Sequence, residues 1–365
     1  MTQETKSKIY KFVIIVITIY AFLLSIKLFG HSFKLFGKGF AETLLNMTSN
    51  PFAGLLIGIV STSIIQSSST TTSIVVGLVA GGAISLNNAV PIIMGANIGT
   101  TITNTLVSLG HLSNRIEFKR AFAAGVVHDF FNISAVVVLF PIELKFHIVE
   151  KTAIASESLF AHVGGMKMFN PLKFILNPVI DLIDDLISFL PYKSIFLTII
   201  SLVLLFTALM YLIKTIRSLV LDKLEIVIDK YLFRNDLIGF ILGGLMTFTV
   251  QSSSVTTSSI IPLAGAGLIS LRQIFPYTLG ANIGTTGTAI LAALATQNDI
   301  AVTVAFAHLF FNIYGIIIFY PLKFIPIGLA EIVSDKASKS KKSLILIVSI
   351  YFSLYFIPAL FLVLT

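Results

Sequence analysis

The sequence predicts an all-α polytopic membrane protein with two inverted-topology repeats, each containing a re-entrant helical hairpin and a discontinuous transmembrane helix. Three observations support this prediction. Hydrophobic residues make up 56% of the chain and charged residues 12%, which is about half the charged share of a soluble domain. Two long apolar segments are interrupted by the same polar string. Residues 66–103 and 251–288 align without a gap, with 21 of 38 positions identical.

Seven apolar runs are long enough to cross a bilayer, which takes about 20 residues. We expect full spans at residues 9–29, 89–109, 121–141, 195–213, 274–295, 300–320 and 343–364. Residues 1–26 resemble a signal peptide because basic residues precede an apolar run. No small-residue cleavage site follows, so we expect a retained first span.

Segments 51–83 and 237–269 are also apolar, but the string QSSS interrupts each near its middle. The two arms of each segment are too short to cross a hydrocarbon core of about 30 Å at a rise of about 1.5 Å per residue. Two such arms are expected to form a re-entrant hairpin. Its polar tip is tolerated only where protein or a watery cavity surrounds it.

Further strings recur along the chain. GANIGTT occurs at Gly95–Thr101 and Gly280–Thr286, and HDFFNI at His128–Ile133 resembles HLFFNI at His308–Ile313. Because the hairpins do not cross, each repeat has an odd number of crossings, and the second copy is inverted. Lys and Arg gather in short stretches between the apolar runs, and the positive-inside rule then places the N terminus inside. We divide the chain into a first repeat (1–145), an extracellular linker (146–194), a second repeat (195–325), and a basic cytoplasmic loop with a final span (326–365).

The composition also excludes several kinds of function. Cysteine is absent, which rules out disulfides, thiol catalysis and cysteine metal sites. The net charge of +8 lies in the stretches between spans, so it does not indicate a nucleic-acid partner. The enzymatic alternative is a membrane hydrolase using a serine with His128 and Asp129. Adjacent side chains on a helix point about 100° apart, and no G-x-S-x-G string occurs, so we expect no enzyme.

The repeated strings place neutral polar groups in apolar surroundings, which is typical of the binding sites of secondary transporters. At each hairpin tip a new helix begins, and its free N–H groups and hydroxyls can hold an anion. The glycines of GANIGTT are expected to break their span and free backbone carbonyls. Carbonyl, hydroxyl and amide oxygens, among them those of Gln66, Asn97, Gln251 and Asn282, are hard ligands suited to sodium. The structural alternative is that Ser and Thr only join helices, but two gapless copies favour a binding site.

Only His128, Asp129 and His308 titrate within the apolar segments, away from their ends. A neutral site must balance an anion with co-bound cations, so we expect sodium rather than a proton as the coupling ion. The histidines occur in both copies and are expected to anchor helices by hydrogen bonds. Asp129 corresponds to Leu309 in the second copy, and we expect it to bind an additional cation.

The strings QSSSTTTSIVVGLV, AVPIIMGANIGTT and EFKRAFAAGVVHDFFN, followed by QSSSVTTSSIIPLAG, PYTLGANIGTT and AHLFFNIYGIIIFYP, resemble the type II sodium–phosphate cotransporter family. The resemblance covers residues 50–145 and 237–325. It implies sodium-driven uptake of inorganic phosphate across the plasma (inner) membrane, with no cofactor and with a homodimer as one possible assembly. It implies phosphate contacts at Ser67, Ser68, Ser69, Ser252, Ser253 and Ser254.

The resemblance also implies sodium sites at Gln251, Ser252, Thr285 and Thr288, with Thr100 as the partner from the first repeat. Electrogenic members carry an aspartate in the HD-x-F-N string, so Asp129 implies one more sodium ion. We add Gln66, Asn97, Thr101, Asn132, Asn282 and Thr286 to the candidate sodium ligands.

This sequence departs from the family pattern in two places. Ala96 and Ala281 stand where many relatives carry serine, which removes one hydroxyl from each repeat. The segment 142–194 is modest in length and free of cysteine, unlike the disulfide-bearing loop of the animal members, and this indicates a bacterial-type member. The nearest alternative is a sodium-coupled carrier of another oxyanion or of a dicarboxylate. No arginine lies within the repeated strings to grip a carboxylate.

Overall fold

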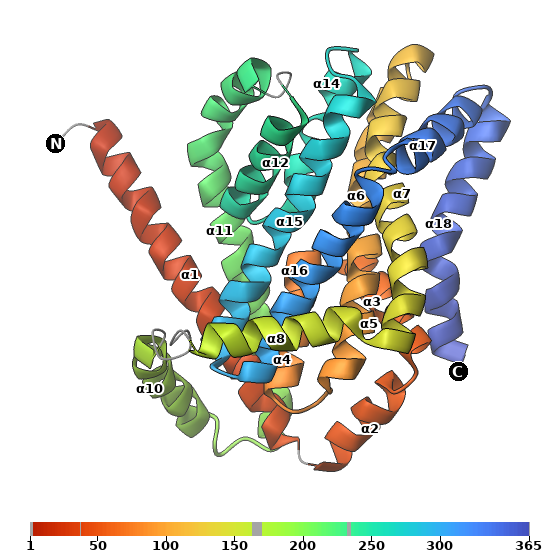
Figure 1. The fold of residues 1–365 in the computed structure, drawn as a ribbon. Helices are drawn as coiled ribbons and strands as arrows, with labels where there is room; N and C mark the ends of the chain where they lie inside the picture. The colour runs from red at the N-terminus through yellow and green to blue at the C-terminus, as the bar shows by residue number, and fades with distance from the viewer. Residues whose placement is uncertain (1–2, 37, 163–169, 232–234, 365) are drawn as a thin grey trace.

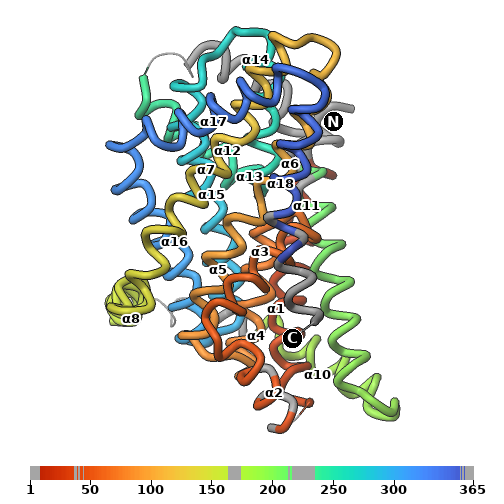
Figure 2. Tube along the Cα trace, turned by 90° about the vertical axis from the view of Figure 1, so that its right-hand side faces the viewer, coloured from red at the N-terminus to blue at the C-terminus, as the bar shows by residue number. Residues whose placement is uncertain are grey.

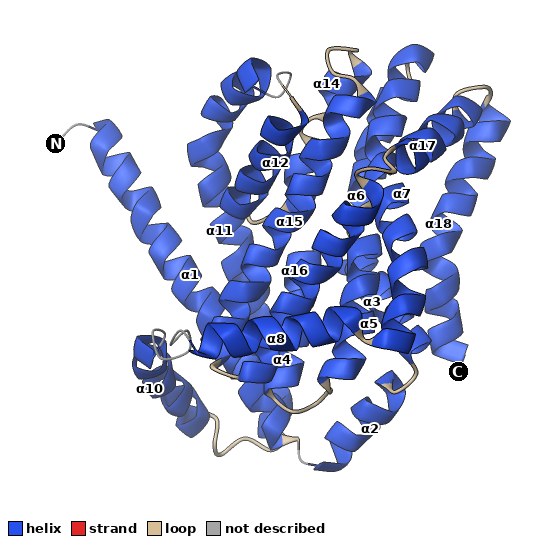
Figure 3. Ribbon diagram, viewed as in Figure 1, coloured by secondary structure: helices blue, strands red, loops and turns tan. Residues whose placement is uncertain are grey.

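The computed structural model describes residues 3–36, 38–162, 170–231 and 235–364, and these residues form helices joined by short loops (Figure 3). Six of the described helices are long and apolar enough to cross a membrane: Ile9–Leu35, Leu86–His111, Arg115–Phe146, Lys193–Leu212, Leu271–Thr296 and Asp299–Phe319. They coincide with six of the seven predicted spans. The seventh, 343–364, lies within a helix whose last side chains are outside the described residues.

The first half of the chain forms α1 (Gln3–Leu35), α2 (Lys38–Thr48), α3 (Pro51–Ile65), α4 (Ser68–Ala80), α5 (Leu86–Gly99), α6 (Ile102–Ser108), the short 3₁₀ helix Leu109–His111 and α7 (Arg115–Phe146). The predicted linker contains α8 (Ile148–His162) and α10 (Asn170–Leu186). Figure 1 shows α8 lying across the lower end of the molecule instead of running along the other helices.

The second half forms α11 (Lys193–Tyr231), α12 (Asp236–Val250), α13 (Ser253–Ser258), α14 (Ile261–Gly265), α15 (Leu271–Thr296), α16 (Asp299–Phe319), α17 (Phe324–Ala337) and α18 (Lys341–Leu364). Helices α1 and α11 pack against each other, and α1 also contacts α4 and α15. Helix α18 packs on α3 and α17.

Both predicted hairpins are present, as α3–α4 and as α12–α13. The first hairpin opens toward the end of the molecule that carries α2, α8 and α10, and the second opens toward the end that carries α14 and α17 (Figures 1 and 2). The two hairpins therefore enter from opposite ends, which is compatible with inverted repeats. The boundaries of the repeats and the inside or outside position of each end stay predictions.

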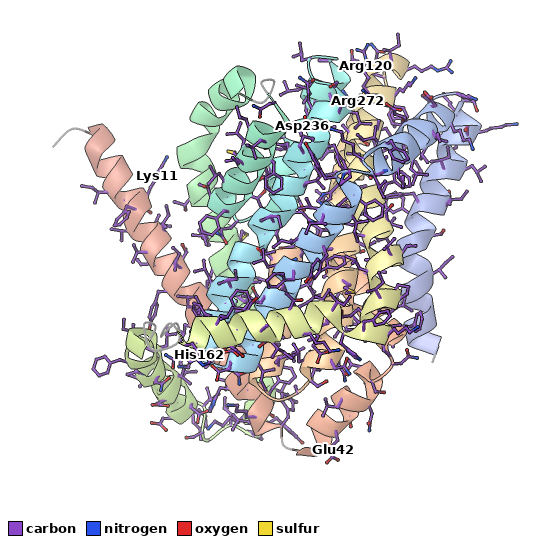
Figure 4. All side chains as sticks on the ribbon, in the orientation of Figure 1. Lys11, Glu42, Arg120, His162, Asp236 and Arg272 are labelled. Carbon is purple, nitrogen blue, oxygen red and sulfur yellow. The ribbon has the colours of Figure 1, made fainter. Side chains whose placement is uncertain are left out.

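Charged side chains lie toward the two ends of the bundle. Arg120, Arg272 and Asp236 are at the end of α14 and α17, and Glu42 is at the opposite end, on α2 (Figure 4). This distribution fits a chain whose middle lies in a bilayer, since a charge at that depth is costly. Asp129 departs from this distribution, because it is 1% exposed in the middle of α7.

The prediction that GANIGTT breaks both spans is right for the first repeat and wrong for the second. The first span is interrupted at Thr100–Thr101, between α5 and α6, whereas α15 continues without a break through Gly280 and Gly284. The glycines have another role here. A Cβ added to Gly280 would overlap the carbonyl oxygen of Phe240 on α12.

The same close approach occurs from the other side, because a Cβ added to Gly243 would overlap the carbonyl oxygen of Tyr277. In the first repeat, a Cβ added to Gly58 would overlap the backbone of α5, and a Cβ added to Gly95 would overlap the backbone of α3. Small residues spaced four apart allow helix backbones to approach closely inside a membrane. The glycines therefore hold each hairpin against the long helix of its own repeat.

The second arms of the two hairpins also differ. Helix α4 is continuous, whereas the corresponding arm is divided into α13 and α14 at Ser259–Ile260. Pro262 stands where the first repeat has Gly77. Proline has no N–H to donate to the carbonyl four residues earlier, and its ring disfavours a helical conformation in the residue before it. The proline therefore explains the interruption.

Candidate functional site

Both hairpin tips are built from the same two-residue turn. Gln66 (φ 57°, ψ 28°) and Gln251 (φ 58°, ψ 25°) adopt the left-handed conformation, which few residues other than glycine adopt. Their N–H groups donate to the carbonyls of Thr62 and Thr247 at 2.6 and 2.7 Å. The next residue is extended in both copies and begins the second arm. The Gln-Ser pair thus encodes the chain reversal.

The serines that follow each glutamine divide into two groups. Ser67 and Ser252 are N-caps, and their hydroxyls accept hydrogen bonds from the backbone N–H groups three residues later at 3.2 and 3.3 Å. Ser68, Ser69 and Ser253 are buried, with exposures of 4%, 3% and 4%. Their hydroxyls make no hydrogen bond with the described residues. One serine of each string therefore holds the turn, and the buried ones that follow retain bonding capacity.

The second tip contacts both repeats. The Gln251 Oε1 accepts a hydrogen bond from the Thr288 hydroxyl on α15 at 2.5 Å, and the Ser254 hydroxyl donates to the Thr100 carbonyl at 3.4 Å. One turn further along, the Asn104 amide donates to the Thr257 hydroxyl at 2.8 Å. The second tip therefore meets both the long helix of its own repeat and the interrupted span of the first repeat.

The first tip is less enclosed. Gln66 is exposed and Ser67 is half-buried. The Thr62 hydroxyl donates to that of Thr71 at 3.0 Å, which joins the two arms of this hairpin. Within the described part of the chain, no side-chain hydrogen bond links Gln66–Ser69 to α5 or α6. Side-chain hydrogen bonds between described residues therefore do not join the first tip to the interrupted span of its own repeat.

Four asparagines join the two repeats. The Asn132 amide donates to the Asn97 carbonyl at 2.8 Å, and the Asn312 amide donates to the Asn282 carbonyl at 3.2 Å, so the same bond occurs in each repeat. The Asn282 amide nitrogen donates to Asn132 Oδ1 of the first repeat at 3.1 Å and to Asn312 Oδ1 of its own repeat at 3.0 Å. Three of the predicted sodium ligands are thus brought together, and they already share hydrogen bonds.

The two histidines, which we expected to anchor helices by hydrogen bonds, differ from each other. The His308 Nε2 lies 3.4 Å from Asn97 Oδ1, which agrees with an anchoring role. Both ring nitrogens of His128 are buried, and neither makes a hydrogen bond of good geometry with the described residues, although the ring interacts with the Asn282 side chain. The anchoring hydrogen bond of His128 therefore stays a prediction.

Asp129 is surrounded by hydroxyl groups. Its Oδ1 accepts hydrogen bonds from Thr101, at the break between α5 and α6, and from the Tyr355 hydroxyl of α18 at 3.0 Å. Its Oδ2 is 3.5 Å from the Thr105 hydroxyl. The described residues provide no Lys or Arg within ion-pair distance of this carboxylate. An anionic group held only by neutral donors suits a cation.

The remaining predicted sodium ligands bond to their own helices. The hydroxyls of Thr100, Thr285 and Thr286 donate to backbone carbonyls three or four residues earlier, at 2.9, 3.2 and 2.7 Å. This is the helix-bonding alternative raised by the sequence. Each of these hydrogen bonds uses only the proton of the hydroxyl group, so the hydroxyl oxygen keeps its lone pairs for a cation.

Sequence reasoning missed several residues of this region. The repeat could have identified Asn312, because Asn312 occupies the position in HLFFNI that Asn132 occupies in HDFFNI. Thr105, Tyr351 and Tyr355 belong to no repeated string, and only the packing of α6 and α18 beside α7 reveals them.

The open end of the second hairpin is held by charge. The Lys323 ammonium lies 2.8 Å from Asp236 Oδ2, and the Tyr320 hydroxyl donates to the same oxygen at 2.9 Å. The hydrogen bond from Lys323 holds the pKa of the Asp236 carboxyl below its usual range. This pair joins the first turn of α12 to the loop between α16 and α17.

Comparison with known proteins identifies relatives over most of the chain. The model of the Na⁺/Pi-cotransporter family matches residues 21–161 and 197–355. Sodium-dependent phosphate transport protein 2A is 33% identical in Ovis aries, over 88% of this chain and 63% of the relative. The Rattus norvegicus protein 2A is 34% identical over 92% and 65%, and Homo sapiens protein 2B is 32% identical over 96% and 66%. The chain thus spans slightly less than two thirds of these relatives. No solved structure matches it.

Proposed function

Because the chain belongs to the Na⁺/Pi-cotransporter family, we propose that it is a secondary active transporter that couples inward sodium movement to the uptake of inorganic phosphate. The relatives that it matches are named as sodium-dependent phosphate transport proteins, which agrees with this function. The proposed location is the plasma (inner) membrane. Assembly as a homodimer stays a prediction.

The observation that carries the proposal is the pair of matching hairpin tips. Each tip reverses the chain inside an apolar bundle and leaves buried serine hydroxyls with unused bonding capacity. An oxyanion supplies the acceptors that such donors lack. We assign phosphate contacts to Ser68 and Ser69 from the first tip and to Ser253 and Ser254 from the second. Ser67 and Ser252 hold the turns.

Sodium supplies the positive charge that these tips do not contain. We propose that Gln251 Oε1, the hydroxyls of Ser252, Thr285 and Thr288, and the backbone at Thr100 form the sodium site beside the second tip. Gln251 and Thr288 already lie 2.5 Å apart at their oxygens, and Ser254 lies against Thr100. Phosphate without sodium would be an uncompensated anion in an apolar bundle, so each ion favours binding of the other.

We further propose that Asp129 binds one more sodium ion and that net charge therefore moves with each phosphate. This carboxylate is separate from the second tip, and its neighbours are hydroxyls. Asn97, Asn132 and Asn282 form a third group. Their hydrogen bonds to one another favour a supporting role, in which they hold the two repeats at a fixed distance. Thr101 belongs to the Asp129 group, and Gln66 is set apart by its exposure.

Phosphate uptake into proteoliposomes under a clamped membrane potential tests the proposal. We expect phosphate to accumulate only with an inward sodium gradient, and we expect an inward current to accompany it. Asp129→Gly is expected to keep uptake and lose the current. Equal phosphate accumulation in choline or potassium buffer contradicts sodium coupling, and strong inhibition by sulfate or succinate points to another anion. An unchanged current in Asp129→Gly contradicts the additional sodium ion.

A further inference from the structure

The surroundings of Asp129 are incomplete without the last helix of the chain. The carboxylate is 1% exposed and accepts hydrogen bonds from two sources: α6 and the break before it, through Thr105 and Thr101, and α18, through Tyr355. Helix α18 lies outside both predicted repeats. A group that the repeats alone would leave open on one side is therefore closed by a segment that belongs to neither.

Two tyrosines of α18 form a chain of hydroxyls that ends at Asp129. Tyr351 and Tyr355 are 8% and 2% exposed and lie four residues apart, so they share one face of the helix. Their hydroxyl oxygens are 3.1 Å apart. A hydroxyl has one proton to donate, and the Asp129 carboxylate can only accept. Tyr355 therefore donates to Asp129 and accepts from Tyr351.

The two carboxylate oxygens are held unequally. Oδ1 accepts from both Thr101 and Tyr355, whereas Oδ2 has a longer contact of 3.5 Å with Thr105, and the Tyr351 hydroxyl also interacts with the carboxyl group. The two donors on Oδ1 fix the orientation of the carboxyl group, and the longer contact leaves Oδ2 lone pairs for a cation. A cation that binds Asp129 therefore finds this oxygen already in a fixed orientation. Binding then costs less conformational entropy, because the carboxyl group does not have to be ordered first.

We propose that Tyr355, supported by Tyr351, is a positioning residue for the sodium ion at Asp129, and that α18 is thereby part of the sodium site. This inference rests on the proposed function, because it assigns sodium to Asp129. The alternative is that the tyrosines only fill space and satisfy their own hydroxyls, as buried tyrosines commonly do. The alternative predicts a change in stability without a change in sodium dependence.

Sodium-dependent thermal stabilisation of the purified protein separates the two explanations. The protein in detergent is titrated with sodium chloride at constant ionic strength, with choline replacing sodium. Tyr355→Phe keeps the ring and removes the hydroxyl, and a hydrogen bond to a charged group is worth a factor of about ten or more in binding. We expect the half-saturating sodium concentration to rise by about that factor, and by less for Tyr351→Phe. Tyr314→Phe is the matched control, since its hydroxyl bonds to Thr152 at 2.7 Å, away from Asp129, and we expect no change in sodium dependence.

A second comparison tests whether Tyr355 acts through Asp129. In an Asp129→Asn background the sodium dependence is already weakened, and we expect Tyr355→Phe to weaken it no further. An equal loss in both backgrounds overturns the proposal, and so does a lower melting temperature with unchanged sodium dependence. If Tyr355→Phe does not fold, Tyr351→Phe takes its place in both backgrounds.

This readout does not depend on transport. Wild-type protein that binds sodium but moves no phosphate contradicts the proposed function and leaves the role of Tyr355 measurable. Wild-type protein that transports phosphate while Tyr355→Phe binds sodium normally contradicts only the role of Tyr355.

Discussion

Gln66 and Gln251 have the same backbone conformation and the same place in the repeat, but they differ in their surroundings. Gln66 is exposed, whereas Gln251 is 8% exposed and its side chain bonds to Thr288 and to the Phe248 carbonyl. In this structure the second repeat encloses its glutamine and the first repeat leaves its glutamine open.

The enclosed glutamine gives the first prediction. Gln251→Ala removes an amide oxygen that lies 2.5 Å from the Thr288 hydroxyl, and we expect the sodium concentration for half-maximal phosphate uptake to rise roughly ten-fold. Gln297→Ala is the control, because Gln297 has the same left-handed backbone (φ 54°) at the end of α15, beyond the tip. Similar sodium dependence in the two variants would show that Gln251 serves the turn and not the ion.

At the scale of elements, the strings shared by the two repeats encode close packing as well as polar groups. Each long helix lies so near the first arm of its hairpin that carbonyl oxygens occupy the place of a side chain. The contact is made by Gly58 and Gly95 in one repeat and by Gly243 and Gly280 in the other. The hairpins cannot move away from these helices without opening a gap in the bundle.

Gly280→Ala tests this packing. The added methyl group would overlap the Phe240 carbonyl, a backbone atom that cannot move without the helix, so we expect a loss of about 1–3 kcal/mol and a lower melting temperature in detergent. Gly328→Ala, on α17, is the control, since nothing lies within 4 Å of its added Cβ and alanine favours a helix. Equal melting temperatures for the two variants would contradict close packing at Gly280.

Hydropathy and repetition predicted both hairpins and six spans, because the length of an apolar run and the cost of a polar interruption are local properties. The same string GANIGTT gives a break in one repeat and a continuous helix in the other. Thr101 and Thr286 both bond back to the carbonyl three residues earlier, of Ile98 and Ile283. Only the Thr101 hydroxyl, at the break, also bonds to Asp129, because position 309 of the second repeat is leucine. The roles of Thr105 and Tyr355 depend on which helices pack against α7, and no local pattern carries that information.

At the scale of the whole molecule, the two repeats are joined near the hairpin tips by side-chain hydrogen bonds. Asn282 donates to Asn132, Asn104 to Thr257, and Ser254 to the Thr100 carbonyl. If the tips bind phosphate and sodium as we propose, the groups of both repeats must stay close together for one ion to affect the binding of the other. We infer that these bonds join the second tip, the interrupted span and the long helices into one body, against which α1 and α11 form the other part.

A double-mutant cycle between Asn104 and Thr257 tests this connection. The two side chains come from α6 and α13, lie 2.8 Å apart at the bonded atoms and are 2% and 4% exposed. Removing one partner leaves the other buried without this hydrogen bond, so Asn104→Ala and Thr257→Val should each destabilise the protein. The double variant should then lose less stability than the sum of the two single losses. Hydrogen bonds between membrane helices average about 0.6 kcal/mol and reach about 1.7 kcal/mol, so we expect a coupling free energy of that size from unfolding in detergent.

Asn235→Ala is the control for this cycle. It removes an N-cap at the start of α12, and its effect on stability should be additive with that of Thr257→Val. Additive effects for Asn104 and Thr257 would mean that the repeats are held together only by apolar packing, and the tips would then be free to move separately during transport.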